Sequence, residues 1–255
     1  MGNDYSIQAV VRAIDVLDEM SGIGREFSIT DLIMRTGMPK SYLFRLLQTL
    51  QSKQFLEVNS INGKYRLGLK TVAMGQTAIR QLEIAKYSGP ALQALKNSSG
   101  ETSFYARFDG ANVRIFDVVH SSQSVRAVAM VGSSLPLHCT AAGKLQMAFS
   151  DAALLSRCLD DCHLEKYGPN TIVARSSLLD ELSRIMDQGY AVEDEEFEAG
   201  VGGVAAPVMN RNNKLAGILG VVAPVSRLNR DRLENELIPL VISAGEEFSA
   251  TCNVG

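Results

Sequence analysis

Residues 40–50 carry the side chains whose types and spacing point most clearly to chemistry. At helical spacing their leucines fall on one face, which predicts a helix anchored on a hydrophobic core. The opposite face combines cationic and hydrogen-bonding side chains: Lys40, Ser41, Tyr42, Arg45 and Gln48. Such side chains can bond to phosphates and base edges. The pattern predicts a DNA-reading helix, with Tyr42 and Arg45 as base readers. An ordinary helix with a charged outer face is the alternative.

The residues just before this helix predict the other half of a helix-turn-helix. Ser28 and Asp31 have the spacing of a capping box, which predicts a helix start. Gly37 suits the left-handed residue that ends a helix, and Pro39 suits the start of the next one. In a helix-turn-helix the second helix enters the major groove. We add Ser28 and Thr30 to the residues expected to contact DNA.

A first helix and a hairpin are predicted beside this pair. Apolar residues at three- and four-residue spacing predict a helix that ends near residue 21 and packs beneath the pair: Ile7, Val10, Val11, Ile14 and Leu17. Two β-prone runs, 55–58 and 64–67, flank Asn62-Gly63 and predict a β-hairpin. As a wing, this hairpin would hold Lys64 and Arg66 near the DNA backbone. The alternative is a plain hairpin that completes the core.

Composition indicates a globular chain whose positive charge is concentrated near the predicted helix pair. Of 255 residues, 46% are hydrophobic and 21% charged, and the net charge is −3. Residues 25–70 hold eight Lys and Arg against three Asp and Glu, whereas residues 86–255 hold fifteen against twenty. Phosphates would require positive charge where the helix pair lies.

The same inspection predicts a cytoplasmic protein in two domains. No run of apolar residues is long enough for a membrane span, and the N-terminus does not resemble a secretory signal. The four cysteines suggest reduced thiols and no disulfide framework. We expect a DNA-binding domain over 1–68, a linker helix over 69–85 and a second domain over 86–255.

The sequence after residue 86 predicts a second domain with a different set of strands and helices from the first. Hairpin patterns predict an antiparallel sheet, and helical patterns before and after them predict covering helices, so we expect an α+β domain. A pocket can lie between such a sheet and its loops. The predicted strands are 102–108, 113–120, 125–131, 201–209 and 215–222. The predicted helices are 140–149, 151–159, 177–188 and a last helix capped by Asn229.

Three clusters have residue types that catalysis or metal binding would use. His138, Cys139 and Lys144 could form a nucleophile with its base, but a pocket-lining loop is the simpler interpretation. Zinc could bind Cys158, Cys162 and His163, yet a fourth ligand is not evident. Four carboxylates form the third cluster, which we interpret as a charged loop stabilised by water: Asp194, Glu195, Glu196 and Glu198. We therefore expect no catalytic residue, no metal and no cofactor.

Several motifs, in order along nearly the whole chain, resemble the IclR family of bacterial transcriptional regulators. They are the winged helix-turn-helix, Leu135-Pro-Leu-His-Cys-Thr-Ala-Ala-Gly-Lys144, Glu193-Asp-Glu-Glu196 with Gly200, Val204-Ala-Ala-Pro207 and Ala223-Pro-Val-Ser-Arg227. The resemblance implies a winged helix-turn-helix followed by a GAF-like effector domain. It also implies a regulator, more often a repressor than an activator, that binds a near-palindromic operator as a homodimer or homotetramer. The effector would be a small organic or aromatic acid.

The resemblance also implies where the effector binds. The Ala141 and Ala142 amides would hold its carboxylate at an unblocked helix start, beside an acidic Glu193 and an apolar Val201. Gly203 stands where the family often has cysteine, and Gly220 and Val222 stand where some members have serine. These departures predict more volume and less polarity, hence an acid bulkier than glyoxylate or pyruvate. The full predicted set is Met130, Leu137, Ala141, Ala142, Glu193, Val201, Gly203, Gly220 and Val222.

Two other classes of function remain open at this point. One is an enzyme whose second domain turns over the small molecule while the DNA-binding domain only regulates. The other is an architectural DNA-binding protein without a ligand. A ligand-dependent shift in melting temperature would distinguish a ligand-responsive regulator from an architectural protein, which binds no ligand.

Overall fold

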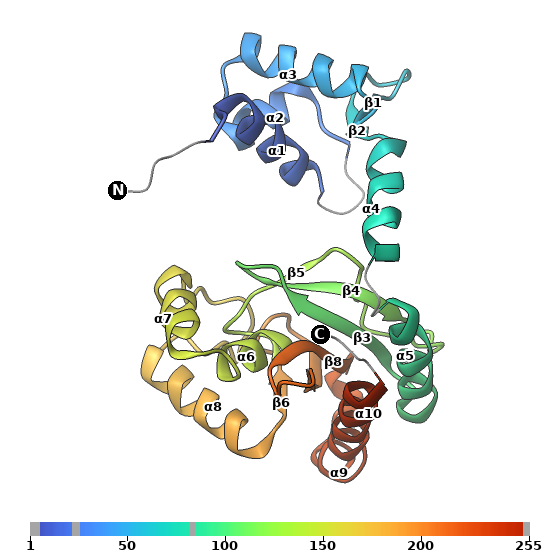
Figure 1. Ribbon diagram of the computed structural model, residues 1–255, viewed down its shortest axis with the longest axis vertical. Helices are drawn as coiled ribbons and strands as arrows, with labels where there is room; N and C mark the ends of the chain where they lie inside the picture. The colour runs from blue at the N-terminus through green and yellow to red at the C-terminus, as the bar shows by residue number, and fades with distance from the viewer. Residues whose placement is uncertain (1–5, 22–25, 82–84, 252–255) are drawn as a thin grey trace. The chain divides into compact units, whose positions relative to one another are not determined.

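The computed structural model describes residues 6–21, 26–81 and 85–251 (Figure 1). The chain divides into two compact units, Met1–Leu82 and Glu83–Gly255, and each is considered by itself. Within those described ranges, no helix has the length and apolar character needed to cross a membrane.

The first unit contains the predicted helix-turn-helix with a wing. Its helices are α1 (Gln8–Met20), α2 (Ile29–Thr36), α3 (Lys40–Ser52) and α4 (Leu69–Gln81). Strands β1 (Leu56–Val58) and β2 (Tyr65–Leu67) pair antiparallel and form the predicted hairpin. Leucines from α2 and α3 fill the core between the helices, joined by Val16 and Met20 of α1.

Local sequence chemistry explains why α2 and α3 form where they do. The Ser28 hydroxyl accepts a hydrogen bond from the Asp31 N–H, and the Asp31 carboxylate accepts one from the Ser28 N–H, so the capping box is complete. Gly37 ends α2 with a left-handed φ of 63°, which glycine adopts without strain. Pro39 then forms the N-cap of α3.

The prediction for the inward face of α1 was wrong for every residue except Leu17, which packs on the core. Ile7, Val10, Val11 and Ile14 are between 37% and 69% exposed, whereas Val16 and Met20 are buried. Helix α1 carries apolar residues on two faces, and its second face (Ala13, Val16, Leu17 and Met20) packs on the core. Periodicity identified an apolar stripe correctly, but it could not tell which of two stripes packs inward.

The second unit is built on one antiparallel sheet, as predicted. Its six strands lie in the order β5-β4-β3-β8-β7-β6. Their bounds are β3 (Thr102–Phe108), β4 (Val113–Val119), β5 (Ser134–Leu135), β6 (Ala191–Asp194), β7 (Val201–Met209) and β8 (Leu215–Pro224). Each pair of neighbours is antiparallel, which gives an α+β domain.

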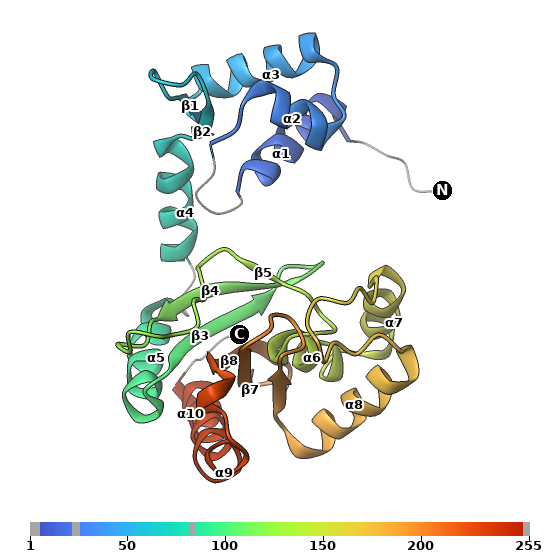
Figure 2. The ribbon, with the colours of Figure 1, turned by 180° about the vertical axis from the view of Figure 1, so that it is seen from behind.

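Helices cover both faces of this sheet. Helices α5 (Ala85–Ser99) and α10 (Ile238–Thr251) lie side by side, and the Phe248 ring of α10 contacts Tyr105 of β3 edge to face (Figures 1 and 2). The opposite face packs in one core with α6 (Ala141–Ala148), α7 (Ala152–Asp161) and α8 (Arg175–Gln188). Short helical segments η1 (Val225–Arg227), α9 (Arg230–Arg232) and η2 (Leu233–Leu237) lead into α10. Asn229 caps α9, the start of the continuous helical run into α10, as predicted.

Two predictions for this sheet were wrong. Residues 125–131 do not form a strand, although Ala127 and Ala129 alternate with exposed neighbours. The Ala127 carbonyl accepts a hydrogen bond from the Thr102 hydroxyl, so its polar group is satisfied without a neighbouring strand. Conversely, Asp194 was interpreted as part of a charged loop with Glu195, Glu196 and Glu198, but it ends edge strand β6, and only the other three follow the strand.

Candidate functional site

Helix α3 presents the predicted polar face to solvent. Lys40, Ser41, Arg45 and Gln48 are exposed, while Leu43 and Leu47 on the opposite face are fully buried. Tyr42 differs from these four because it is half-buried and packs against the core. The Arg45 guanidinium lies 6.0 Å from the centre of the Tyr42 ring. Tyr42 therefore flanks Arg45 at the edge of the exposed face.

The remaining predicted DNA contacts differ in how free their side chains are. The Ser28 hydroxyl donates to Asp31 Oδ2 at 2.8 Å within the capping box, while Thr30 beside it is exposed. In the wing, Lys64 is exposed, whereas Arg66 pairs with Glu57 at 3.1 Å. The charge of Arg66 is therefore partly compensated within the protein, so Lys64 is better suited to meet a phosphate.

Sequence inspection missed one residue on the exposed face of α3. Phe44 is 48% exposed and lies between Ser41 and Gln48 at helical spacing. A search for polar groups passes over it, although a helical projection of the same residues would have found it.

Most residues of the predicted effector set share one face of the sheet. Glu193, Gly203 and Val222 lie opposite one another across β6, β7 and β8. Because alternate residues of a strand face the same side, Val201 and Gly220 share this face. Leu137, Ala141 and Ala142 belong to the core packed against it, together with the half-buried Val222. Met130 is half-buried and is not among the described residues of that core.

The expected extra volume at Gly220 is absent. Gly220 pairs with Phe104 of β3, and a Cβ added to Gly220 would lie 2.9 Å from the Phe104 ring and 2.5 Å from the Val204 carbonyl oxygen. A Cβ at Gly203 would lie 2.6 Å from the Val221 carbonyl oxygen. These glycines therefore allow close backbone and ring approach, and the result is an apolar, aromatic wall that sequence inspection missed.

The start of helix α6 is capped by a side chain, whereas we expected it to be unblocked. Thr140 caps it, because its hydroxyl oxygen accepts a hydrogen bond from the Gly143 N–H at 3.0 Å. The Ala141 N–H donates to Glu193 Oε2 at 3.4 Å. The Ala142 N–H bonds to neither the Thr140 hydroxyl nor the Glu193 carboxylate. A ligand carboxylate at this helix start would meet the Ala142 amide and the Glu193 carboxyl together.

Burial makes Glu193 an unusual carboxyl. It raises the pKa of Glu193 to about 7, and the negative charge of Glu196 contributes in the same direction, against the opposing bond from the Ala141 amide. Lys144 opposes the rise as well, but its ammonium group is already held by Glu196 at 2.5 Å, Glu181 at 3.2 Å and the Val192 carbonyl at 2.7 Å. Glu193 is therefore close to half-protonated near neutral pH.

Protonation of Glu193 predicts how stability depends on pH. Its folded-state pKa of about 7 lies above the ordinary 4.5, so the stabilisation is present below pH 4.5 and is lost as pH rises through 7. Glu193→Gln is uncharged at every pH, so we expect it to be more stable than the wild type at pH 8, with the difference shrinking toward pH 5. Denaturant midpoints at both pH values measure this. Parallel profiles for the two proteins would contradict it.

Glu196 was predicted to lie in a charged loop stabilised by water, but it forms a buried ion pair with Lys144. The Lys144 side chain is only 1% exposed, and that of Glu196 is 9% exposed. Among the buried side-chain oxygens of the described residues, Glu196 Oε2 alone has no hydrogen-bond partner. The pair joins α6 to the segment after β6, which sequence inspection could not detect because the residues are 52 positions apart.

The geometry does not favour a nucleophile at Cys139. Burial raises the pKa of its thiol to about 12, so the thiol stays protonated. His138 instead lies with Nδ1 3.4 Å from Cys162 Sγ and Nε2 2.9 Å from the Glu165 carbonyl oxygen. Lys144 is engaged by two carboxylates, as described above.

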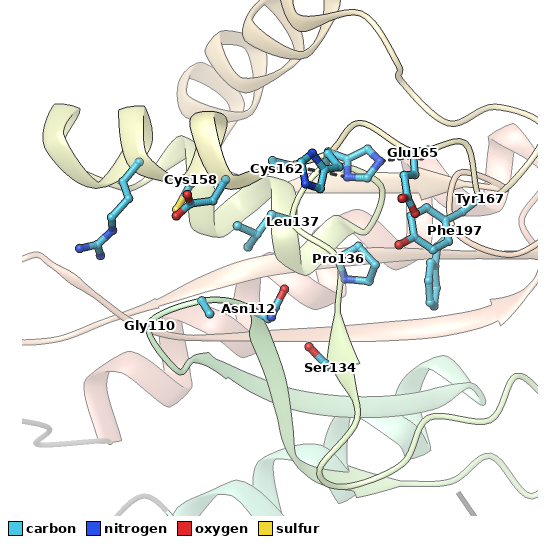
Figure 3. Close-up of a pocket in the computed structure, with 15 residues that line it drawn as sticks. Gly110, Asn112, Ser134, Pro136, Leu137, Cys158, Cys162, Glu165, Tyr167 and Phe197 are labelled. Atoms are coloured by element: carbon cyan, nitrogen blue, oxygen red, sulfur yellow. Dashed lines mark hydrogen bonds between the residues drawn. The ribbon is translucent and has the colours of Figure 1, made fainter. Parts of the chain in front are cut away.

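Cys158 and Cys162 line a cleft of about 500 Å³ in the second unit (Figure 3). Opposite them lie Gly110 and Asn112 from the turn between β3 and β4, and Tyr167 and Phe197 form its aromatic end (Figure 3). In the described part of the chain, no three His, Cys, Asp or Glu side chains are arranged to hold a metal ion. Of the predicted effector set, only Leu137 reaches this cleft.

Comparison with known proteins accounts for both units. The model of the IclR helix-turn-helix domain matches residues 9–60, and that of the bacterial transcriptional regulator IclR C-terminal domain matches residues 76–250. The Escherichia coli regulator XynR is 33% identical over 229 residues, which cover 90% of this chain and 91% of XynR. The E. coli DNA-binding transcriptional repressor YiaJ is 31% identical over 91% of this chain and 84% of its own.

A solved structure shares the whole fold. The crystal structure of an IclR-type regulator from Silicibacter sp. TM1040 superposes with a TM-score of 0.85, covering 97% of each chain at 24% sequence identity. The fold of the chain, a helix-turn-helix followed by an antiparallel sheet with helices, therefore matches that of this structure over 97% of the chain.

Proposed function

The chain belongs to the IclR family of bacterial transcriptional regulators, and we propose that it is a cytoplasmic repressor of catabolic genes. A small acid would either release the repressor from its operator or strengthen its binding there. Its helix-turn-helix makes it a DNA-binding protein. The observation that carries the proposal is the exposed face of α3, where Arg45 and Gln48 point away from fully buried leucines. The repressor assignment follows the relative YiaJ. An effector can shift DNA affinity only as far as it favours one arrangement of the protein.

We infer that the effector is an aromatic or otherwise apolar carboxylic acid. Its carboxylate would bind at the Ala142 amide beside Glu193, because helix starts with small side chains expose amide donors to anions. The Phe104 ring over Gly220, with Val201 and Val222 on the same face, supports an apolar body for the ligand. Aromatic rings pack favourably against one another beyond the area that they bury.

Melting temperatures across a panel of acids test this assignment, because a ligand that binds only the folded state raises the melting temperature. The panel would contain benzoate, 4-hydroxybenzoate, phenylacetate, pyruvate and glyoxylate. Aromatic acids should produce the larger shifts, and Phe104→Leu should reduce them. Phe248→Leu, a similar change in α10 beyond the opposite face of the sheet, should leave them unchanged. Shifts with pyruvate or glyoxylate alone would contradict an aromatic effector.

We propose that no chemical step follows binding. An acid recovered unchanged after prolonged incubation with the protein would agree with a sensor. A time-dependent loss of the acid that scales with protein concentration would favour the alternative in which residues 86–255 form an enzyme.

Exposed apolar residues in the first unit support a homodimer or a larger assembly of dimers. Val10, Val11 and Ile14 of α1 form an exposed stripe with Ile7, the residue that precedes the helix. Leu69, Val72 and Met74 of α4 are also exposed. Contiguous apolar surface of this kind marks interaction sites. A dimer would place two copies of α3 in successive major grooves of a near-palindromic operator.

A charge placed on the α1 stripe should prevent this association. Ile14→Glu would bury a carboxylate at the interface, so we expect a smaller mass by light scattering and weaker operator binding. Met34→Glu makes the same change at an exposed residue of α2 outside the stripe, and it should keep the wild-type mass. An unchanged mass for Ile14→Glu would show that α1 does not join the subunits.

A further inference from the structure

Phe44 is the apolar residue on the exposed face of the DNA-reading helix. At helical spacing its neighbours there are Ser41 and Gln48, which carry hydrogen-bonding groups, and Arg45 follows it directly. Its side chain remains 48% exposed. Tyr42 lies half-buried at the edge of this face, and Phe44 is the one apolar side chain that α3 exposes there.

The core of the first unit does not explain this phenylalanine. The half-buried residues of α3 that pack against the core are Tyr42 and Leu46, and Phe44 is not among the described residues of that core. It also lies on a different helix from the α1 stripe proposed for dimerisation. The exposed face of the second helix of a helix-turn-helix contacts the major groove of DNA. The exposure of Phe44 on this face therefore suggests that its ring contacts DNA.

The major groove offers one apolar group to such a side chain. Each base pair presents hydrogen-bond donors and acceptors there, and only thymine adds a methyl group, on C5. Polar neighbours on the same face can bond to purine edges, whereas a phenyl ring cannot replace those bonds. An aromatic ring against a methyl group removes apolar surface from water without leaving a polar group unpaired.

We propose that Phe44 is a specificity-determining residue that recognises the C5-methyl group of a thymine in each operator half-site. This inference rests on α3 being the DNA-reading helix, and it adds an apolar contact to those predicted for the base readers Tyr42 and Arg45. The operator would then carry a thymine within reach of Phe44, beside the base that Arg45 contacts.

Uracil substitution tests the contact directly, because uracil lacks the methyl group and keeps every hydrogen-bonding edge of thymine. An operator is first selected from random duplexes by the purified full chain, and each thymine of a half-site is then replaced singly. We expect one or two positions at which uracil weakens wild-type binding about fourfold, from about 0.8 kcal/mol for one buried methyl group. Phe44→Ala should bind the thymine and uracil duplexes equally at those positions.

Matched variants separate this contact from other effects. Met34→Ala alters an exposed apolar residue of α2 and should keep the full sensitivity to uracil. Phe44→Leu should retain part of it. The inference is overturned if uracil has no effect on the wild type, if Phe44→Ala keeps the sensitivity, or if Phe44→Ala weakens random and selected duplexes alike. Failure to select any operator would instead refute sequence-specific binding itself.

Discussion

Replacing Lys144 by methionine is expected to destabilise the second unit by about 3–5 kcal/mol, because a buried ion pair would lose one partner. The side chains of Lys144, Glu196 and Glu181 are 1%, 9% and 14% exposed. Methionine fills a similar volume, so the loss would come mainly from the buried Glu196 carboxylate left without its cation, since Glu181 would keep its ion pair with Arg184. Chemical denaturation followed by circular dichroism would record it as a lower midpoint.

Two further variants identify the source of this loss. Arg184→Ala removes the exposed partner of Glu181. The Arg184 side chain is 69% exposed, so this change should cost about 1 kcal/mol or less. The double change Lys144→Met with Glu196→Gln should recover part of the stability, because a neutral amide is less costly to bury than a carboxylate. If Lys144→Met lowered the free energy of unfolding no more than Arg184→Ala, the buried pair would not stabilise the contact between α6 and the segment after β6.

Replacing Arg45 by alanine is expected to weaken binding to the operator by about 1–3 kcal/mol, or about 5-fold to 150-fold, because a paired hydrogen bond to a base would be lost. Binding to random DNA should fall far less. Arg45 is exposed on α3 and lies beside the Tyr42 ring, and it is free of any ion pair found in the described chain. Fluorescence anisotropy on selected and random duplexes gives both affinities.

Lys64→Ala is the matched change for a backbone contact. It should weaken both duplexes alike and reduce the slope of log affinity against log salt by about 1. Equal losses on the two duplexes for Arg45→Ala would reject a base-reading role for Arg45 and assign it to the phosphates.

Local chemistry made the first unit predictable from sequence. The ends of α2 depend on contacts within a few residues, such as Ser28 with Asp31, and on the left-handed φ of Gly37. The inward face of α1 was not predictable in this way. Both of its faces are apolar, and the choice between them depends on packing against α2 and α3.

The effector region depends on contacts that are distant in sequence. Glu193 reaches Ala141, and Glu196 reaches Lys144, only because β6 pairs with β7 at the edge of the sheet facing α6. The Phe104 ring lies over Gly220 because β3 pairs with β8 in one particular register. Motifs could indicate which residues gather there, but the cap at Thr140 and the buried Lys144 required the folded chain.

The most direct test of the account measures DNA binding and its response to acids together. The purified chain would be titrated against a labelled fragment from upstream of its own gene at low ionic strength, with and without each acid of the panel. We predict binding that is tighter than to random DNA and that at least one aromatic acid changes. Failure to bind any upstream fragment better than random DNA, with or without acids, would contradict it.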